Sequence, residues 1–97
     1  GGGLLGNIPR ILPSKCQAVL HAGSWPRPPI FPYLQALGNL PDEEMNRVFN
    51  NGLGMVVVVP AHEADEALNR IGSLGEKAFR VGEIVRRDQN APAIRIL

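Results

Sequence analysis

Residues 55–59 have the sequence MVVVV, and this stretch carries the clearest secondary-structure signal in the chain. Five consecutive apolar residues, four of them β-branched, are too few for a helix and are typical of a strand that is apolar on both faces. A strand of this kind lies in the middle of a sheet. We therefore predict that residues 55–59 form a central strand, which Pro60 ends.

The next segment, residues 62–74, predicts an amphipathic helix. Apolar residues recur there at positions i, i+3, i+4 and i+7, which places on one face Ala64, Ala67, Leu68, Ile71 and Leu74. Acidic residues stand near its start and Gly75 follows its last residue, which suits the helix dipole and a glycine at the C-terminal end.

Outward from this stretch, the patterns predict three more helices and three more strands. Apolar residues at helical spacing indicate helices over residues 4–12, 30–37 and 41–50. Alternating apolar residues indicate strands over residues 15–22, 77–85 and 93–97, the second with a bulge at Gly82. This order of elements predicts an α+β fold, a layered α/β sandwich in which helices pack on a mixed sheet.

The charge composition argues against two classes of partner. The chain has 10 basic and 9 acidic residues, a formal net charge of +1, and neither sign forms a block. Because nucleic-acid binders and polybasic membrane anchors carry excess positive charge, we expect no nucleic-acid and no membrane partner. No apolar run approaches the ~20 residues needed to cross a bilayer. The single cysteine favours a reducing, cytoplasmic setting.

The first five residues are GGGLL, without an initiator methionine. Three glycines that lead directly into an apolar run resemble the middle of a motif. We therefore expect the chain to be a C-terminal fragment of a longer protein, with residues 1–97 forming one domain around one modest core.

The same three glycines are the first candidate binding site. Glycine lets the backbone approach an anion closely, and the N–H groups at the start of a helix attract a phosphate. For three glycines taken alone, an ordinary flexible turn is the simpler interpretation. No Gly-Lys-Ser/Thr sequence follows, so the motif is not a P-loop.

The second candidate is the loop FNNGLGM over residues 49–55. Its Asn-Gly pair and second glycine allow a positive φ and a tight entry into the next segment. The loop either closes on a ligand at the edge of the sheet or serves only as a helix-to-strand turn, and both interpretations stay open.

The remaining chemically active residue types form no catalytic constellation. His21 and His62 are far apart and lack partners at metal-ligand spacing, so no metal site is expected. Cys16 alternates with apolar strand positions and is interpreted as a structural thiol. Ser24 has no nucleophile-elbow context. The residues alone assign no catalytic group.

Several segments together resemble the start of the C-terminal domain of the phosphoribosylformylglycinamidine cyclo-ligase family, also called AIR synthetase. The matching residues are 1–5 (GGGLL), 7–10 (NIPR), 12–13 (LP), 24–25 (SW), 29–31 (PIF), 34–35 (LQ), 38–39 (GN), 44–45 (EM), Arg47, 49–50 (FN) and 52–55 (GLGM). The resemblance is firm to about Pro60 and looser to Gly82 and Ile84. Arg27 and Pro28 depart from the family pattern in a variable loop.

The resemblance implies a function in de novo purine biosynthesis. Members of the family use ATP to close formylglycinamidine ribonucleotide into 5-aminoimidazole ribonucleotide, with release of ADP and phosphate. They are homodimers whose N-terminal domain supplies the dimer core and most ligands of ATP and Mg²⁺. This chain lacks that half, so we expect the fragment alone to be inactive. The C-terminal domain of the family is a layered α/β arrangement, partly ferredoxin-like.

The resemblance also implies which residues face the cleft between the two domains. The substrate- and phosphate-binding candidates are Gly1, Gly2, Gly3, Asn7, Asn50, Gly52 and Gly54. Two alternatives differ in class: a non-catalytic α+β module that binds a small ligand or a partner, and a related ATP-dependent kinase or synthetase of the same superfamily.

Overall fold

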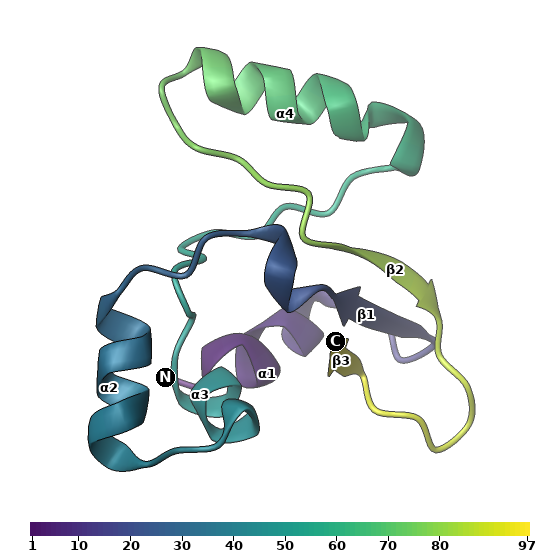
Figure 1. Cartoon of the computed structure of the whole chain (residues 1–97). Coiled ribbons are helices and arrows are strands. Elements are labelled where there is room, and N and C mark those ends of the chain that lie inside the picture. The colour runs from purple at the N-terminus through teal and green to yellow at the C-terminus, as the bar shows by residue number, and fades with distance from the viewer.

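A three-stranded mixed sheet forms the centre of the computed structural model, which describes residues Gly1–Leu97 (Figure 1). The strand order is β2-β1-β3. Strand β1 (Cys16–Leu20) pairs antiparallel with β2 (Gly82–Arg86) and parallel with β3 (Ile94–Ile96). Ala18 lies opposite Ile84 on one side and Ile94 on the other, so β1 is the central strand.

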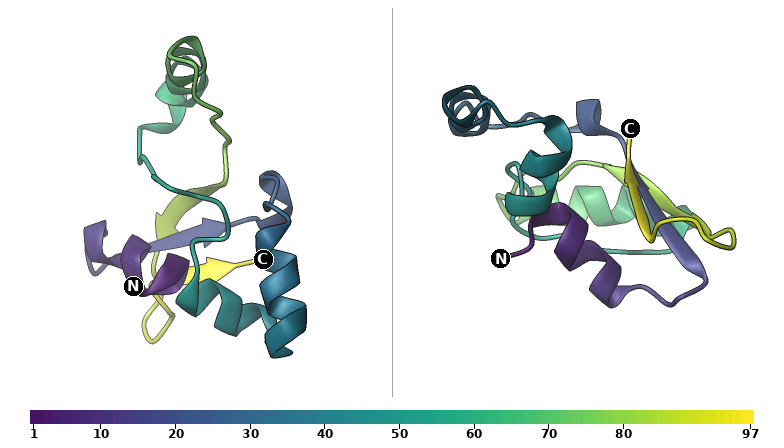
Figure 2. Two further views of the ribbon diagram at one scale, coloured as in Figure 1. Left: turned by 90° about the vertical axis from the view of Figure 1, so that its left-hand side faces the viewer. Right: turned by 90° about the horizontal axis from the view of Figure 1, so that it is seen from below.

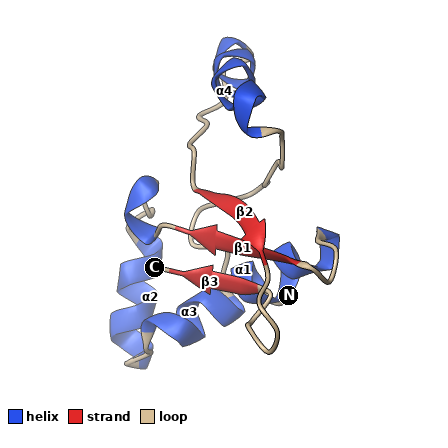
Figure 3. Ribbon diagram, turned by 90° about the vertical axis from the view of Figure 1, so that its right-hand side faces the viewer, coloured by secondary structure: helices blue, strands red, loops and turns tan.

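Helices surround this sheet unevenly. The helical elements are α1 (Gly3–Asn7), η1 (Ile8–Ile11), η2 (Ala22–Ser24), α2 (Ile30–Gly38), α3 (Asp42–Val48), η3 (Ala61–Glu63) and α4 (Ala64–Ser73). Helix α1 packs against α3 and continues into η1 beside β1. Helix α4 stands away from the sheet at the end of two extended arms (Figures 1 and 3, and Figure 2, left).

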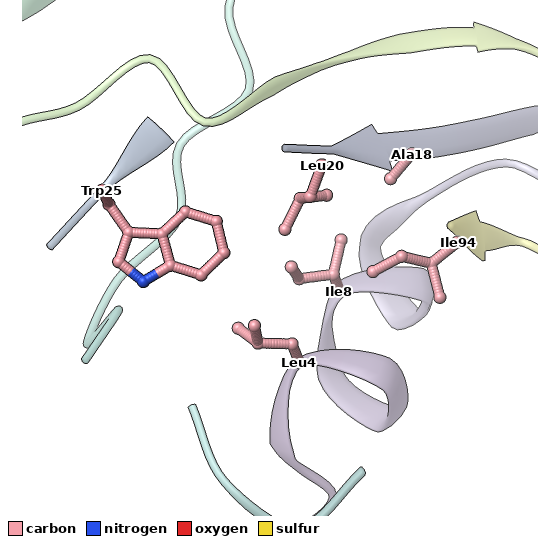
Figure 4. Packing of buried hydrophobic residues seen from close by; sticks show 6 residues of the cluster. All are labelled: Leu4, Ile8, Ala18, Leu20, Trp25 and Ile94. Atoms are coloured by element: carbon pink, nitrogen blue, oxygen red, sulfur yellow. The ribbon is translucent and has the colours of Figure 1, made fainter. Parts of the chain in front are cut away.

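The core lies between the sheet and the first helix. Its six buried side chains meet in one cluster (Figure 4): Leu4, Ile8, Ala18, Leu20, Trp25 and Ile94. Burying each of the larger ones contributes about 1.5–3 kcal/mol to folding. The indole N–H of Trp25 donates a hydrogen bond to the backbone oxygen of Asn51 at 3.0 Å, so its polar edge is satisfied within the core.

The predicted α+β class is confirmed, and most predicted elements are present near their expected positions. The helix expected over residues 4–12 is α1 followed by one 3₁₀ turn. The helices expected over 30–37 and 62–74 correspond to α2 and α4. No helix is long and apolar enough to span a membrane.

The prediction of a central strand over residues 55–59 is wrong for this chain. These residues form no regular secondary structure, and Met55 and Val57 are 84% and 58% exposed. The central position belongs to β1 instead. A β-branched apolar run supplies the propensity for a strand, but a strand also needs the N–H and C=O groups of a neighbour.

The prediction of a bulge at Gly82 is also wrong. β2 begins at Gly82, later than expected, and its register against β1 is continuous from Leu20↔Gly82 to Cys16↔Arg86. A Cβ atom at this position would collide with the backbone oxygen of Val19. Gly82 therefore marks a close backbone approach rather than an extra residue.

Candidate functional site

Helices α1, α2 and α3 come together near the N-terminus (Figure 1). A hollow of about 360 Å³ opens between residues of these segments. It is lined by Gly1, Gly3, Asn7, Phe31, Val48, Phe49 and Asn50. Three segments separated in sequence therefore meet at this point: the glycine turn, the start of α2 and the end of α3.

The glycine turn has a backbone that other residues rarely adopt. Gly2 and Gly3 have φ angles of 97° and 54°, in the left-handed region. A Cβ atom at Gly3 would lie 2.5 Å from the oxygen of Asn46 and 2.7 Å from the oxygen of Phe49. Glycine at position 3 thus lets α1 approach the end of α3, and part of the triple-glycine signal is structural.

Asn7 holds this turn in place. Its side-chain Nδ2 donates to the backbone oxygens of Gly1 at 2.9 Å and Gly3 at 2.8 Å. The Oδ1 atom forms no hydrogen bond with the chain, and neither do the N–H groups of Gly2 and Gly3. One acceptor and two donors of the turn are therefore left without a partner in the chain.

The opposite wall ends in a tight turn over residues 50–53. The N–H of Leu53 donates to the oxygen of Asn50 at 3.1 Å, and the two central residues have φ angles of 52° and 100°. Positive φ at both central positions is typical of a type I′ turn, which favours Asn-Gly. The Oδ1 atom of Asn50 accepts a hydrogen bond from Gly52 N at 2.8 Å, which fixes its side chain.

Three apolar residues line the hollow that were not among the predicted site residues. Phe31 and Phe49 pack edge to face, with ring centroids 5.9 Å apart at 65°, and Val48 lies beside them. For Val48 and Phe49 the sequence holds an indication, because Phe49 directly precedes the Asn-Gly turn that was a predicted site. Phe31 is too far along the chain for sequence spacing to place it there.

The seven predicted site residues divide into two groups. Gly1, Gly3, Asn7 and Asn50 line the hollow, and Gly2 belongs to the same turn. The other two, Gly52 and Gly54, do not line it.

Gly52 and Gly54 lie in different surroundings from each other. Gly52 lines a second hollow of about 530 Å³, and a Cβ atom at this position would clash with Cδ of Pro28. A Cβ atom on Gly54 would meet nothing within 4 Å. Gly54 also lacks the positive φ that Gly52 has.

The chemistry available in the first hollow is that of binding. No Asp, Glu, His, Lys, Arg or Cys side chain lines it. The chain contains no group of three or more His, Cys, Asp or Glu side chains that could hold a metal ion. Amide groups and two aromatic rings suit a polar, planar or anionic ligand, but they provide neither a nucleophile nor a general base.

Comparison with known proteins identifies the family of this arrangement. A family model described as AIR synthase related protein, C-terminal domain, matches residues 1–94. The chain belongs to this family. The resemblance seen in the sequence is thereby confirmed over nearly the whole chain.

Three curated relatives of this AIR synthase related chain illustrate the similarity. Each is named phosphoribosylformylglycinamidine cyclo-ligase. The protein of Syntrophotalea carbinolica is 47% identical over 98 residues, and those of Geotalea uraniireducens and Geobacter sulfurreducens are each 48% identical over 97 residues. All three matches cover 100% of this chain but only 28% of the relative.

Proposed function

We propose that this chain is the C-terminal part of a phosphoribosylformylglycinamidine cyclo-ligase. The complete enzyme uses ATP to close formylglycinamidine ribonucleotide into 5-aminoimidazole ribonucleotide in purine biosynthesis. The match of the family model to residues 1–94 carries the proposal, and relatives of this name at 47–48% identity support it. Because the chain spans 28% of those relatives, the activity is assigned to the longer polypeptide.

Within that enzyme, the chain contributes a wall of the substrate site. The two free N–H groups of the glycine turn bind a phosphate or another anionic group of the substrate. Asn7 Oδ1 accepts a hydrogen bond from a substrate N–H or O–H, and Phe31 and Phe49 close the apolar side. Asn50 holds the facing turn. Gly52 and Gly54 stay in the proposal as cleft residues, but they belong to a different part of the surface.

ATP and Mg²⁺ are assigned to residues outside this chain. The first hollow holds no carboxylate for Mg²⁺ and no lysine or arginine for the phosphates of ATP, so its residues do not fit either group. We also propose that the complete enzyme is a homodimer, formed through the part of the polypeptide outside this chain, and that it is cytoplasmic.

A chimeric enzyme tests this function. The Syntrophotalea carbinolica cyclo-ligase is prepared with residues 1–97 of this chain in place of its matching segment; this protein is called the chimera below. We expect substrate-dependent phosphate release within about tenfold of the unaltered relative, a barrier change of at most about 1.4 kcal/mol. A folded chimera without this activity would contradict the proposal and favour the non-catalytic module.

A further inference from the structure

An apolar stretch of the chain is left on the surface. The side chains of Met55, Val57 and Val58 are 84%, 58% and 49% exposed. Within residues 55–59, Val56 is the one side chain that packs against the core cluster. A contiguous exposed run of this kind marks an interaction site more often than solvent-facing surface, because water contact with each side chain is unfavourable.

The backbone of the same stretch is also without partners. No N–H or C=O group of residues 55–59 forms a hydrogen bond with another part of the chain. Extended, apolar, β-branched backbone with free donors and acceptors is a template for strand pairing.

The helix that follows is poorly covered as well. None of the residues of α4 is buried, although its apolar positions recur on one face. Leu74, just after it, is 81% exposed and Phe79 in the returning arm is 39% exposed. The apolar face of such a helix normally packs on a sheet, and Figures 1 and 3 show that α4 lies apart from the sheet.

We propose that residues 55–59 are a docking edge for a β-strand from the part of the longer polypeptide outside these 97 residues. The proposal rests on the function proposed above, in which the chain is one part of a cyclo-ligase. Nearly three quarters of each relative lies outside the matched region, so ample chain exists to supply the strand. The incoming strand presents alternate apolar side chains, adds a ladder beside residues 55–59 and extends the sheet beneath α4.

The pattern of residues 55–59 favours this occupant over a second copy of the chain. Apolar side chains project from both faces of the stretch, which is typical of a strand in the interior of a sheet whose two faces are both covered. Pairing with a second copy about a two-fold axis supplies a neighbour on one edge only. The longer polypeptide can supply a neighbouring strand on each edge and side chains that cover the second face.

Hydrogen exchange of individual amides, measured on residues 1–97 alone and on the chimera, tests the proposal. We expect the amides of residues 55–59 to exchange almost freely in the chain alone and at least about 100-fold more slowly in the chimera. Ala18 N, bonded to Ala93 O, and Leu97 N, bonded to Leu20 O, serve as protected references in both proteins.

Each other outcome has a definite meaning. Free exchange of residues 55–59 in a chimera whose reference amides are protected would overturn the proposal. Protection in the chain alone that grows with protein concentration would overturn it in favour of self-association. If the reference amides of the chimera are unprotected, the unaltered relative is measured at its matching positions, with the same two outcomes. The exchange measurement does not depend on enzymatic activity. Failure of the strand-docking proposal can therefore be distinguished from failure of the catalytic proposal.

A pair of charged variants gives an independent readout. Val57→Lys and Leu37→Lys each place a lysine at an exposed apolar position, 58% and 67% exposed. Both are expected to leave the melting temperature of the chain alone nearly unchanged. In the chimera, Val57→Lys is expected to lower it by at least about 5 °C more than Leu37→Lys, because a covered strand buries the charge. Equal shifts in the chimera would contradict strand docking.

Discussion

Replacing Gly3 by alanine is expected to destabilise the chain severely, although the change adds one methyl group. Gly3 has a φ of 54°, and its new Cβ atom would stand 2.5 Å from Asn46 O, 2.7 Å from Phe49 O and 2.8 Å from the carbonyl carbon of Arg47. All three are backbone atoms at the end of α3, so no side chain can rotate away. The methyl group therefore has to push α1 and α3 apart.

The size of the effect follows from two costs. A left-handed conformation costs a residue with a side chain about 1–2 kcal/mol. Overpacking by a methyl group costs about 1–3 kcal/mol more. Together they remove roughly 2–5 kcal/mol, a large share of the 5–15 kcal/mol that folded domains typically possess. For a domain of this size, each kcal/mol lowers the melting temperature by about 4–8 °C.

Gly6→Ala provides the matched control in the same helix. A Cβ atom there meets nothing within 4 Å, and Gly6 has no positive φ. Alanine at an unhindered helical position is expected to stabilise by about 0.5–1 kcal/mol. Thermal and urea unfolding followed by circular dichroism compare the two variants. If Gly3→Ala unfolds at the same temperature as Gly6→Ala, the close contact between α1 and α3 does not exist in solution.

Four further outcomes are expected. Gly54→Ala leaves the melting temperature of the chain unchanged, because its Cβ atom enters open space, and a drop of several degrees would refute this. Asn7→Ala raises the KM of the chimera by about three- to tenfold, because the glycine turn loses two hydrogen bonds and the ligand loses a hydrogen-bond acceptor. An unchanged KM in steady-state kinetics would show that Asn7 does not belong to the site. Trp25→Phe lowers the free energy of unfolding by about 1–3 kcal/mol in urea titrations because Asn51 O loses its donor, and a neutral result would show that water replaces it. Residues 1–97 alone release no phosphate from ATP when substrate is present. Substrate-dependent release by the purified chain would contradict the proposal that ATP binds to residues outside this chain.

Local features of the fold could be predicted from the sequence, because neighbouring residues determine them. The turn at Asn51-Gly52 followed from the ease with which both residues adopt a positive φ. β1 and α4 followed from the alternation and the helical spacing of their apolar residues. In these cases the interactions that decide the structure lie within one segment.

Features that depend on distant segments could not be predicted in this way. Residues 55–59 have the composition of a central strand, but whether a neighbour lies beside them depends on other parts of the polypeptide. Gly82 suggested a bulge, whereas the approach of Val19 O, 63 positions earlier in the chain, is what excludes a side chain there. Similarly, the sequence gives no sign that Gly54 lies in open space while Gly3 touches another helix.

The placement of the single tryptophan gives the molecule an internal optical reporter. Trp25 is the only tryptophan among the 97 residues, and it is 7% exposed. Its indole N–H is bound to Asn51, one residue from Asn50 at the rim of the hollow. Its emission spectrum therefore depends on core packing and on the conformation of that rim together. Unlabelled protein in a fluorimeter can thus be followed through both unfolding and ligand titration.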